Sequence, residues 1–129
     1  MVLIILGACA FIGIILGLVS RGLESPFLGS GNIGYVEVKG VIRNSRKVVE
    51  WIDKLSESSS IRAILVRIDS PGGGVAPSQE IYDALKRARE KGKPVVASIG
   101  SLGASGGYYI ACAADKIVAD PGSVTGSIG

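Results

Sequence analysis

Three short runs rich in β-branched residues, each followed by a helical pattern, most strongly constrain the fold of this chain. The runs cover residues 33–38, 61–68 and 94–99. Between them, apolar residues recur every three or four positions, which is the spacing of one face of a helix. Strands that alternate with helices are typical of an α/β domain, in which right-handed crossovers make the strands parallel. We therefore expect repeated β-α units, with a fourth short strand at residues 116–119.

The segments between the predicted strands carry helix signals. Asn44 or Ser45 is suited to cap a first helix that continues to about residue 58, and Pro77 suits the first turn of a second helix. Trp51 falls on the apolar face of the first helix, so we predict that its side chain lies in the core.

The chain begins with an apolar segment, Val2–Val19, that contains no charged residue. Its length is close to the ~20 residues with which a helix spans a bilayer. No Ala-x-Ala cleavage signal follows, which favours a retained anchor over a cleaved signal peptide. We predict a transmembrane anchor at residues 1–20, a linker at 21–32 and the N-terminal part of one α/β domain at 33–129.

Charge and cysteine usage exclude several classes of site. The formal net charge is only +3, and basic residues do not interleave with aromatic ones as in a nucleic-acid interface, so no nucleic-acid partner is expected. Cys9 and Cys112 lack the spacing of metal ligands. We expect no metal or cofactor, and we predict that Cys112 is a small buried residue.

Two glycine-rich turns, at residues 69–74 and 100–107, follow the second and third predicted strands. Because the carboxyl ends of neighbouring parallel strands meet at one edge of a sheet, we expect the two turns to lie side by side. Neither turn matches a nucleotide-binding pattern. The only Gly-Lys pair, at residues 92 and 93, is followed by Pro94 where a P-loop needs Ser or Thr. Pro77 occupies the place of the last glycine of a dinucleotide fingerprint.

Ser105 lies in the second turn, at the start of a short helix of small residues expected at 104–114. The turn matches G-x-S-x-G, but the chain contains no histidine, so a histidine-dependent hydrolase is excluded and a lysine base is the alternative. Backbone N–H groups of Gly72 or Gly73 and of Gly106 are candidates for an oxyanion hole. The residues alone leave open that both are merely tight turns that need glycine.

Four segments, in this order, carry a resemblance to a known family. They read RIDSPGGG at 67–74, SLGASGGYY at 101–109, IACAADKI at 110–117 and PGSVTGSIG at 121–129. The chain resembles the signal peptide peptidase A (SppA-type) family of membrane-anchored Ser/Lys peptidases, which have a ClpP/crotonase-like fold. The resemblance covers about residues 33–129. It implies that Ser105 is the nucleophile and that residues 70–73 form the oxyanion-hole loop.

The resemblance also implies partners and a location. Substrates would be remnant signal peptides or other apolar peptides, and the enzyme would form a homo-oligomer. It would be a single-pass protein of the cell membrane, with its catalytic domain on the extracytoplasmic side of the bilayer. A related membrane Ser/Lys peptidase family that accompanies NfeD-type proteins is an alternative. An acyl-CoA-binding crotonase relative is disfavoured by the serine and the apolar segment.

The family's general-base lysine lies some tens of residues beyond its nucleophile. Lys116 opens the fourth predicted strand, and Lys86, Lys91 and Lys93 lie on a solvated helix or at its end. A lysine base needs burial that lowers its pKa, and none of these positions provides it. We expect a partial domain whose base lies beyond residue 129. Alternatively, the chain is a catalytically incomplete anchored module that assembles with full-length copies.

Overall fold

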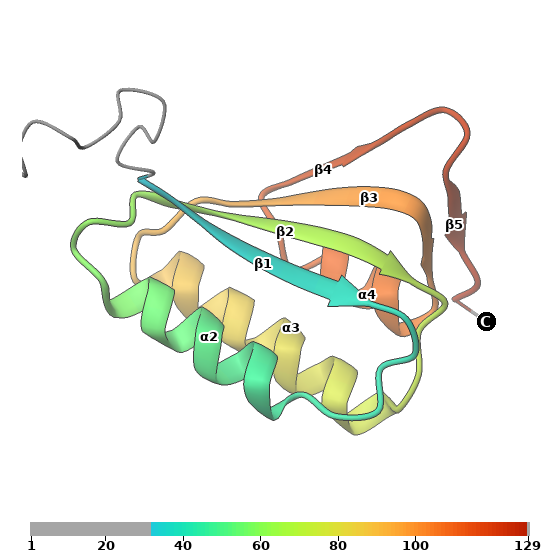
Figure 1. Ribbon diagram of the computed structural model, residues 1–129, viewed down its shortest axis with the longest axis horizontal. Helices are drawn as coiled ribbons and strands as arrows, with labels where there is room; N and C mark the ends of the chain where they lie inside the picture. The colour runs from blue at the N-terminus through green and yellow to red at the C-terminus, as the bar shows by residue number, and fades with distance from the viewer. Residues whose placement is uncertain (1–31, 129) are drawn as a thin grey trace, which may run out of the picture. The chain divides into compact units, whose positions relative to one another are not determined.

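The structure is a computed structural model that describes residues 32–128, so the predicted anchor and nearly all of the predicted linker lie outside the described residues. The elements follow in the order β1 (Ile33–Lys39), α2 (Arg46–Glu57), β2 (Ala63–Ser70), α3 (Val75–Glu90), β3 (Val95–Ala104), α4 (Gly106–Ala111), β4 (Lys116–Ala119) and β5 (Val124–Gly126) (Figure 1). Within residues 32–128, no helix is long and apolar enough to cross a membrane.

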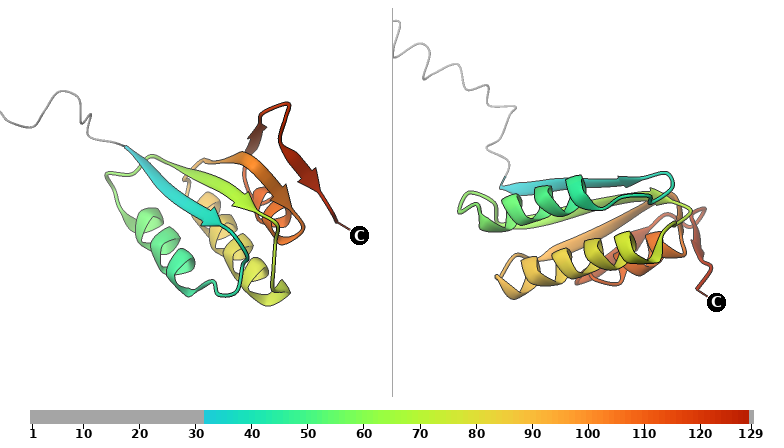
Figure 2. Two further views of the ribbon diagram at one scale, coloured as in Figure 1. Left: turned by 45° about the vertical axis from the view of Figure 1, so that its right-hand side comes forward. Right: turned by 90° about the horizontal axis from the view of Figure 1, so that it is seen from below.

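The strands form one parallel sheet whose order, β1-β2-β3-β4, is also the order of the chain. The short strand β5 pairs with the far end of β3. Helices α2, α3 and α4 all lie on the same face of the sheet (Figures 1 and 2). The predicted α/β fold, built from repeated β-α units with parallel strands, is confirmed.

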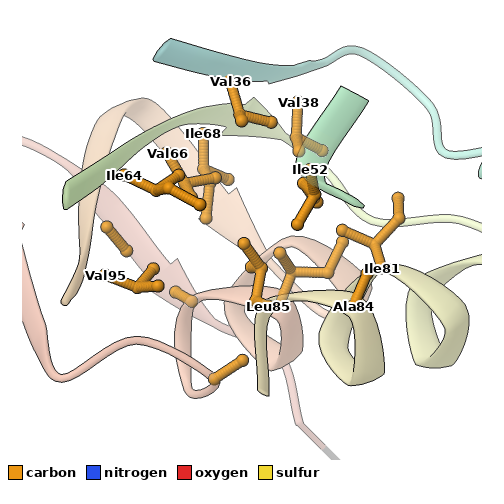
Figure 3. Packing of buried hydrophobic residues seen from close by; sticks show 14 of the residues in the cluster. Val36, Val38, Ile52, Ile64, Val66, Ile68, Ile81, Ala84, Leu85 and Val95 are labelled. Carbon is orange, nitrogen blue, oxygen red and sulfur yellow. The ribbon is translucent and has the colours of Figure 1, made fainter. Parts of the chain in front are cut away.

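The hydrophobic core lies between the sheet and its three helices (Figure 3). Side chains alternate along β2, so that Ile64, Val66 and Ile68 are buried toward the helices while Leu65 and Arg67 on the other face are only partly buried. The predicted helical stripe of α3 is buried on the same core, through Ile81, Leu85 and Ala88. A one-sided core is unusual for a parallel sheet, which commonly has both faces covered.

The strand boundaries differ from the predicted ones at the end of the sheet that carries the two turns. Strand β2 begins at Ala63 and continues to Ser70, because Asp69 and Ser70 still pair with Lys39 and Gly103. Strand β3 continues to Ala104, since its last residues leave β4 and pair with β5. Long-range pairing therefore extends both strands into segments whose composition indicates turns.

Two predictions of burial are wrong. Trp51 is 44% exposed, because α2 packs on the sheet through Ile52 and Leu55 instead. The Trp51 indole N–H donates to the carbonyl oxygen of Tyr35, on the edge strand β1, at 2.8 Å. Cys112 is exposed. Helix α4 is shorter than predicted and ends at Ala111, so Cys112 forms its C-cap on the solvent side.

Candidate active site

The two glycine-rich turns lie side by side at the carboxyl ends of β2 and β3, as the sequence predicts (Figure 1). A Cβ atom placed on Gly72 would lie 2.7 Å from both the backbone nitrogen of Gly106 and the Cβ of Ser105. Gly72 also has a φ of +95°, in the region that favours glycine. A glycine at this position therefore lets the first turn approach the second.

Ser105 joins β3 to α4 in a strained backbone conformation. Its φ of 51° and ψ of −122° lie in a region that costs a residue other than glycine about 1–3 kcal/mol. Two backbone bonds hold it there: its N–H donates to the Gly126 oxygen at 2.8 Å, and its carbonyl oxygen accepts from the Tyr109 N–H at 2.9 Å. The Ser105 residue is exposed, and its hydroxyl makes no hydrogen bond to any residue between 32 and 128. This is the arrangement of a serine on a nucleophile elbow.

The backbone groups of Gly72 and Gly74 are all occupied. The Ile42 N–H donates to the Gly72 oxygen at 2.9 Å, and the Gly74 N–H donates to the Ile42 oxygen at 2.8 Å. The Gly72 N–H donates to the Ser70 Oγ at 3.0 Å. The Gly74 oxygen accepts from both the hydroxyl and the N–H of Ser78. Gly72 therefore has no free donor for a substrate.

Two N–H donors next to Ser105 stay free within the described part of the chain. The Gly106 N–H opens α4 and so has no acceptor inside the helix. The Gly73 N–H likewise makes no hydrogen bond to any of residues 32–128, and the Gly73 nitrogen lies 3.5 Å from where a Cβ on Gly106 would be. Of the three glycines predicted to form the oxyanion hole, Gly73 and Gly106 thus keep an available N–H, while Gly72 does not.

A pocket of about 330 Å³ opens beside Ser105. It is lined by Gly73, Val75, Ser78, Gln79, Ser105, Gly106, Tyr109, Ser127 and Ile128. Val75 and Ile128 are 86% and 76% exposed, so the rim of the pocket offers apolar surface to a ligand. Larger hollows lie elsewhere, but none of their lining residues belongs to either glycine-rich turn except Gly100 and Ser101, which lie before the Ser105 elbow.

Sequence reasoning missed a polar and aromatic contact in the wall of this pocket. The Tyr109 hydroxyl donates to the Gln79 Oε1 at 2.6 Å, and the Tyr109 ring stacks on Tyr82 with a centroid distance of 4.6 Å. Gln79 and Tyr82 are three residues apart, so they share one face of α3. The sequence does predict that Gln79 and Tyr82 lie on one helix face. It could not identify Tyr109 on α4 as the residue that contacts both, because that contact arises only in the fold.

None of the described lysines lies at the pocket. Lys86, Lys91 and Lys116 are exposed. Lys93 is half-buried, but its ammonium donates to the carbonyl oxygens of Ser58 and Ile61, at the opposite end of α3 from Val75. No cluster of three or more His, Cys, Asp or Glu in residues 32–128 is suited to bind a metal ion.

Comparisons with known sequences point to peptidases. Residues 87–129 match the model of Peptidase family S49. The protein named "Putative protease slr0021" of Synechocystis sp. is 52% identical over 98 residues, which are 75% of this chain and 35% of that protein. Protease 4 of Salmonella typhi is 41% identical over 113 residues, 88% of this chain and 16% of the relative. The chloroplastic serine protease SPPA of Arabidopsis thaliana is 44% identical over 85 residues, 66% and 12% respectively.

Solved structures give the same fold. The ClpP1 N165D mutant from Listeria monocytogenes has a TM-score of 0.55 and 26% identity, over 62% of this chain and 46% of that one. The K138A mutant of the 1510-N membrane-bound stomatin-specific protease, in complex with a substrate peptide, has a TM-score of 0.61 and 24% identity, over 77% and 46%. At this identity the second match bears on the fold alone.

The fold and the sequence matches together relate the chain to the class of serine peptidases with a ClpP-like fold. Within that class, the chain is related to the S49 peptidases of the SppA type, and the predicted resemblance is confirmed. The chain spans about a third or less of the length of the three curated relatives above.

Proposed function

We propose that this chain carries the nucleophile and the oxyanion hole of a Ser/Lys peptidase. The observation that supports this most strongly is the Ser105 elbow, where an exposed hydroxyl lies next to the N–H groups of Gly73 and Gly106, all three without a hydrogen bond to residues 32–128. A tight turn that served only the fold would not require a non-glycine residue at a strained φ. Strain of this kind is typical of functional sites.

In the proposed reaction, the Ser105 oxygen attacks the scissile carbonyl carbon of a peptide as a base removes the hydroxyl proton. The carbonyl oxygen becomes an oxyanion, which the Gly73 and Gly106 N–H groups stabilise. The base then returns the proton to the leaving amine, and water hydrolyses the acyl-enzyme. The helix N-terminus at Gly106 adds a partial positive charge beside the oxyanion.

We propose that the base is a lysine from outside residues 32–128. The described lysines support this by their positions, because those at 86, 91 and 116 are exposed and Lys93 is bonded to two carbonyl groups away from the pocket. A lysine acts as a base near neutral pH only where burial lowers its pKa.

The proposed substrates are remnant signal peptides or other apolar peptides. The apolar rim formed by Val75 and Ile128 is compatible with such ligands, and the similarity to SppA-type peptidases supports the choice. We further propose a single-pass anchor in the cell membrane at residues 1–20, an extracytoplasmic catalytic domain at 33–129 and a homo-oligomeric enzyme. The apolar composition of Val2–Val19 supports the anchor.

The test is the Ser105→Ala variant of the protein in its natural full length, assayed on an apolar fluorogenic peptide. We expect turnover to fall by about 10⁴-fold or more, since loss of the nucleophile removes covalent catalysis. Lys116→Ala is the control, because Lys116 is exposed on β4, and it should keep most of the activity. Undiminished turnover by the Ser105 variant would overturn the proposal.

The absence of a lysine near Ser105 within residues 32–128 favours one second candidate. In it, the chain is a catalytically incomplete anchored module that assembles with full-length copies. Purified residues 1–129, incubated alone with the same peptide, should not cleave it under either candidate, because every lysine of this chain lies within residues 32–128. Cleavage that depends on Ser105 would exclude the incomplete module and would also overturn the proposal of a base from outside these residues.

A further inference from the structure

Ser70, the last residue of β2, is fully buried, with 0% of its surface exposed. Serine is mostly an exposed residue, so a buried hydroxyl needs hydrogen-bond partners. Ser70 has both an acceptor and a donor as partners: its hydroxyl donates to the Gly40 oxygen at 2.6 Å and accepts from the Gly72 N–H at 3.0 Å. It does not line the pocket beside Ser105. Its contacts are therefore with the backbone that shapes the site.

The two partners of Ser70 belong to segments that meet at Gly73. Gly40 directly follows β1, has a left-handed conformation with a φ of +68°, and leads to Ile42. Ile42 then forms a parallel bridge with Gly73 through the backbone groups of Gly72 and Gly74. Ser70 thus connects the residue that starts this bridging segment with the glycine that opens the turn.

This bonding determines which way the Gly73 N–H faces. In a parallel pairing, successive peptide groups along a strand point to alternate sides. The Gly72 oxygen and the Gly74 N–H face Ile42, so the Gly73 N–H faces away from it, toward the elbow at Ser105. The direction of this donor depends on the bonds that hold its neighbours.

We propose that Ser70 is a positioning residue, whose hydroxyl holds the oxyanion-hole loop so that the Gly73 N–H meets the developing charge. The inference rests on the proposed function of Ser105. An oxyanion donor must come within about 2.7–3.1 Å of the oxygen to be effective. A displacement of about 1 Å at a reacting centre can cost about 10²-fold in rate. Loss of the Ser70 hydroxyl leaves the buried Gly72 N–H unpaired and releases the loop.

The experiment compares Ser70→Ala with the wild type in the natural full-length protein, below the melting temperature of each variant. We expect kcat to fall by about 10-fold to 100-fold while KM changes by less than about threefold. The affinity for a peptide boronic acid, which forms a tetrahedral adduct on the serine, should fall in parallel with kcat/KM. A merely structural role for Ser70 would not shift this affinity once the variant is folded.

Two further variants keep the test decisive. Ser56→Ala removes another buried hydroxyl, which donates to the Asp53 oxygen within α2, and should leave kcat and boronate affinity unchanged. Ser70→Cys nearly keeps the shape with a weaker donor, so it should fold even where Ser70→Ala does not, and it should still lower kcat. A folded Ser70 variant with wild-type kcat and boronate affinity would overturn the inference. Turnover without Ser105 would instead overturn the proposed function.

Discussion

At the scale of single residues, the candidate site depends on which backbone groups are left free. The sequence predicts the position of Ser105, because a serine between small residues after a strand indicates an elbow. It could not decide whether Gly72 or Gly73 is the better candidate for the proposed oxyanion donor. That choice follows from Ile42, which pairs with the turn from the end of β1 and which no local pattern connects with it.

Gly72 provides a test of the close approach between the two turns. Gly72→Ala adds a Cβ at 2.7 Å from the Gly106 nitrogen, in addition to the left-handed strain. Gly92→Ala introduces the same kind of strain at a φ of +81°, with nothing within 4 Å. We expect about 1–2 kcal/mol of destabilisation for Gly92→Ala and about 1–3 kcal/mol more for Gly72→Ala. Urea unfolding of both variants measures this, and equal losses would contradict the contact.

At the scale of the elements, Asp115 connects three of them. Asp115 directly precedes β4. Its carboxylate accepts a hydrogen bond from the Val95 N–H, at the start of β3, at 2.8 Å, and another from the Arg89 Nε, near the end of α3, at 2.7 Å. The Val95 N–H, and then the Arg89 guanidinium, lower the pKa of Asp115 below its ordinary value. Nothing in the sequence pattern predicts this role, because the three partners come together only in the fold.

The lowered pKa of Asp115 makes stability depend on pH. A carboxyl whose pKa is lower in the folded state than in the unfolded state stabilises the fold above the ordinary aspartate pKa, and that stabilisation is lost as the pH falls through the folded value. We expect the free energy of unfolding to decrease from pH 7 to pH 3, with a smaller decrease in Asp115→Asn. The effect is modest because the side chain is 39% exposed.

Urea unfolding at the two pH values provides the measurement. Asp53→Asn is the control, because the Asp53 carboxylate forms an exposed ion pair with Arg87 at 3.3 Å. Such pairs contribute less than about 1 kcal/mol. An unchanged pH dependence in Asp115→Asn would contradict the role given to Asp115.

At the scale of the whole molecule, the order of strands and helices could be predicted from periodicity, because each β-α unit forms from contiguous residues. The change of partner along β3, from β4 to β5, could not be predicted, since β5 is a strand of three residues with no strong pattern of its own. The same pairing brings the Gly126 oxygen to the Ser105 N–H. A distant, short strand thus completes the elbow.

The one-sided core predicts unequal effects of substitutions along a single strand. Ile68→Ala removes a side chain that is 0% exposed and faces the helices, so we expect a loss of about 2–5 kcal/mol. Leu65→Ala acts on the opposite, partly exposed face of β2 and should cost clearly less. Thermal or urea unfolding compares them. A loss at Leu65 as large as that at Ile68 would show that this face is covered in solution.

The central claim is that Ser105 is the nucleophile, and active-site labelling tests it most directly. The natural full-length protein is treated with a serine-directed fluorophosphonate, digested and analysed by mass spectrometry. The elbow geometry predicts one stoichiometric adduct on Ser105, which disappears in Ser105→Ala and slows in competition with an apolar peptide. An adduct on a different serine, with Ser105 unmodified, would contradict the account.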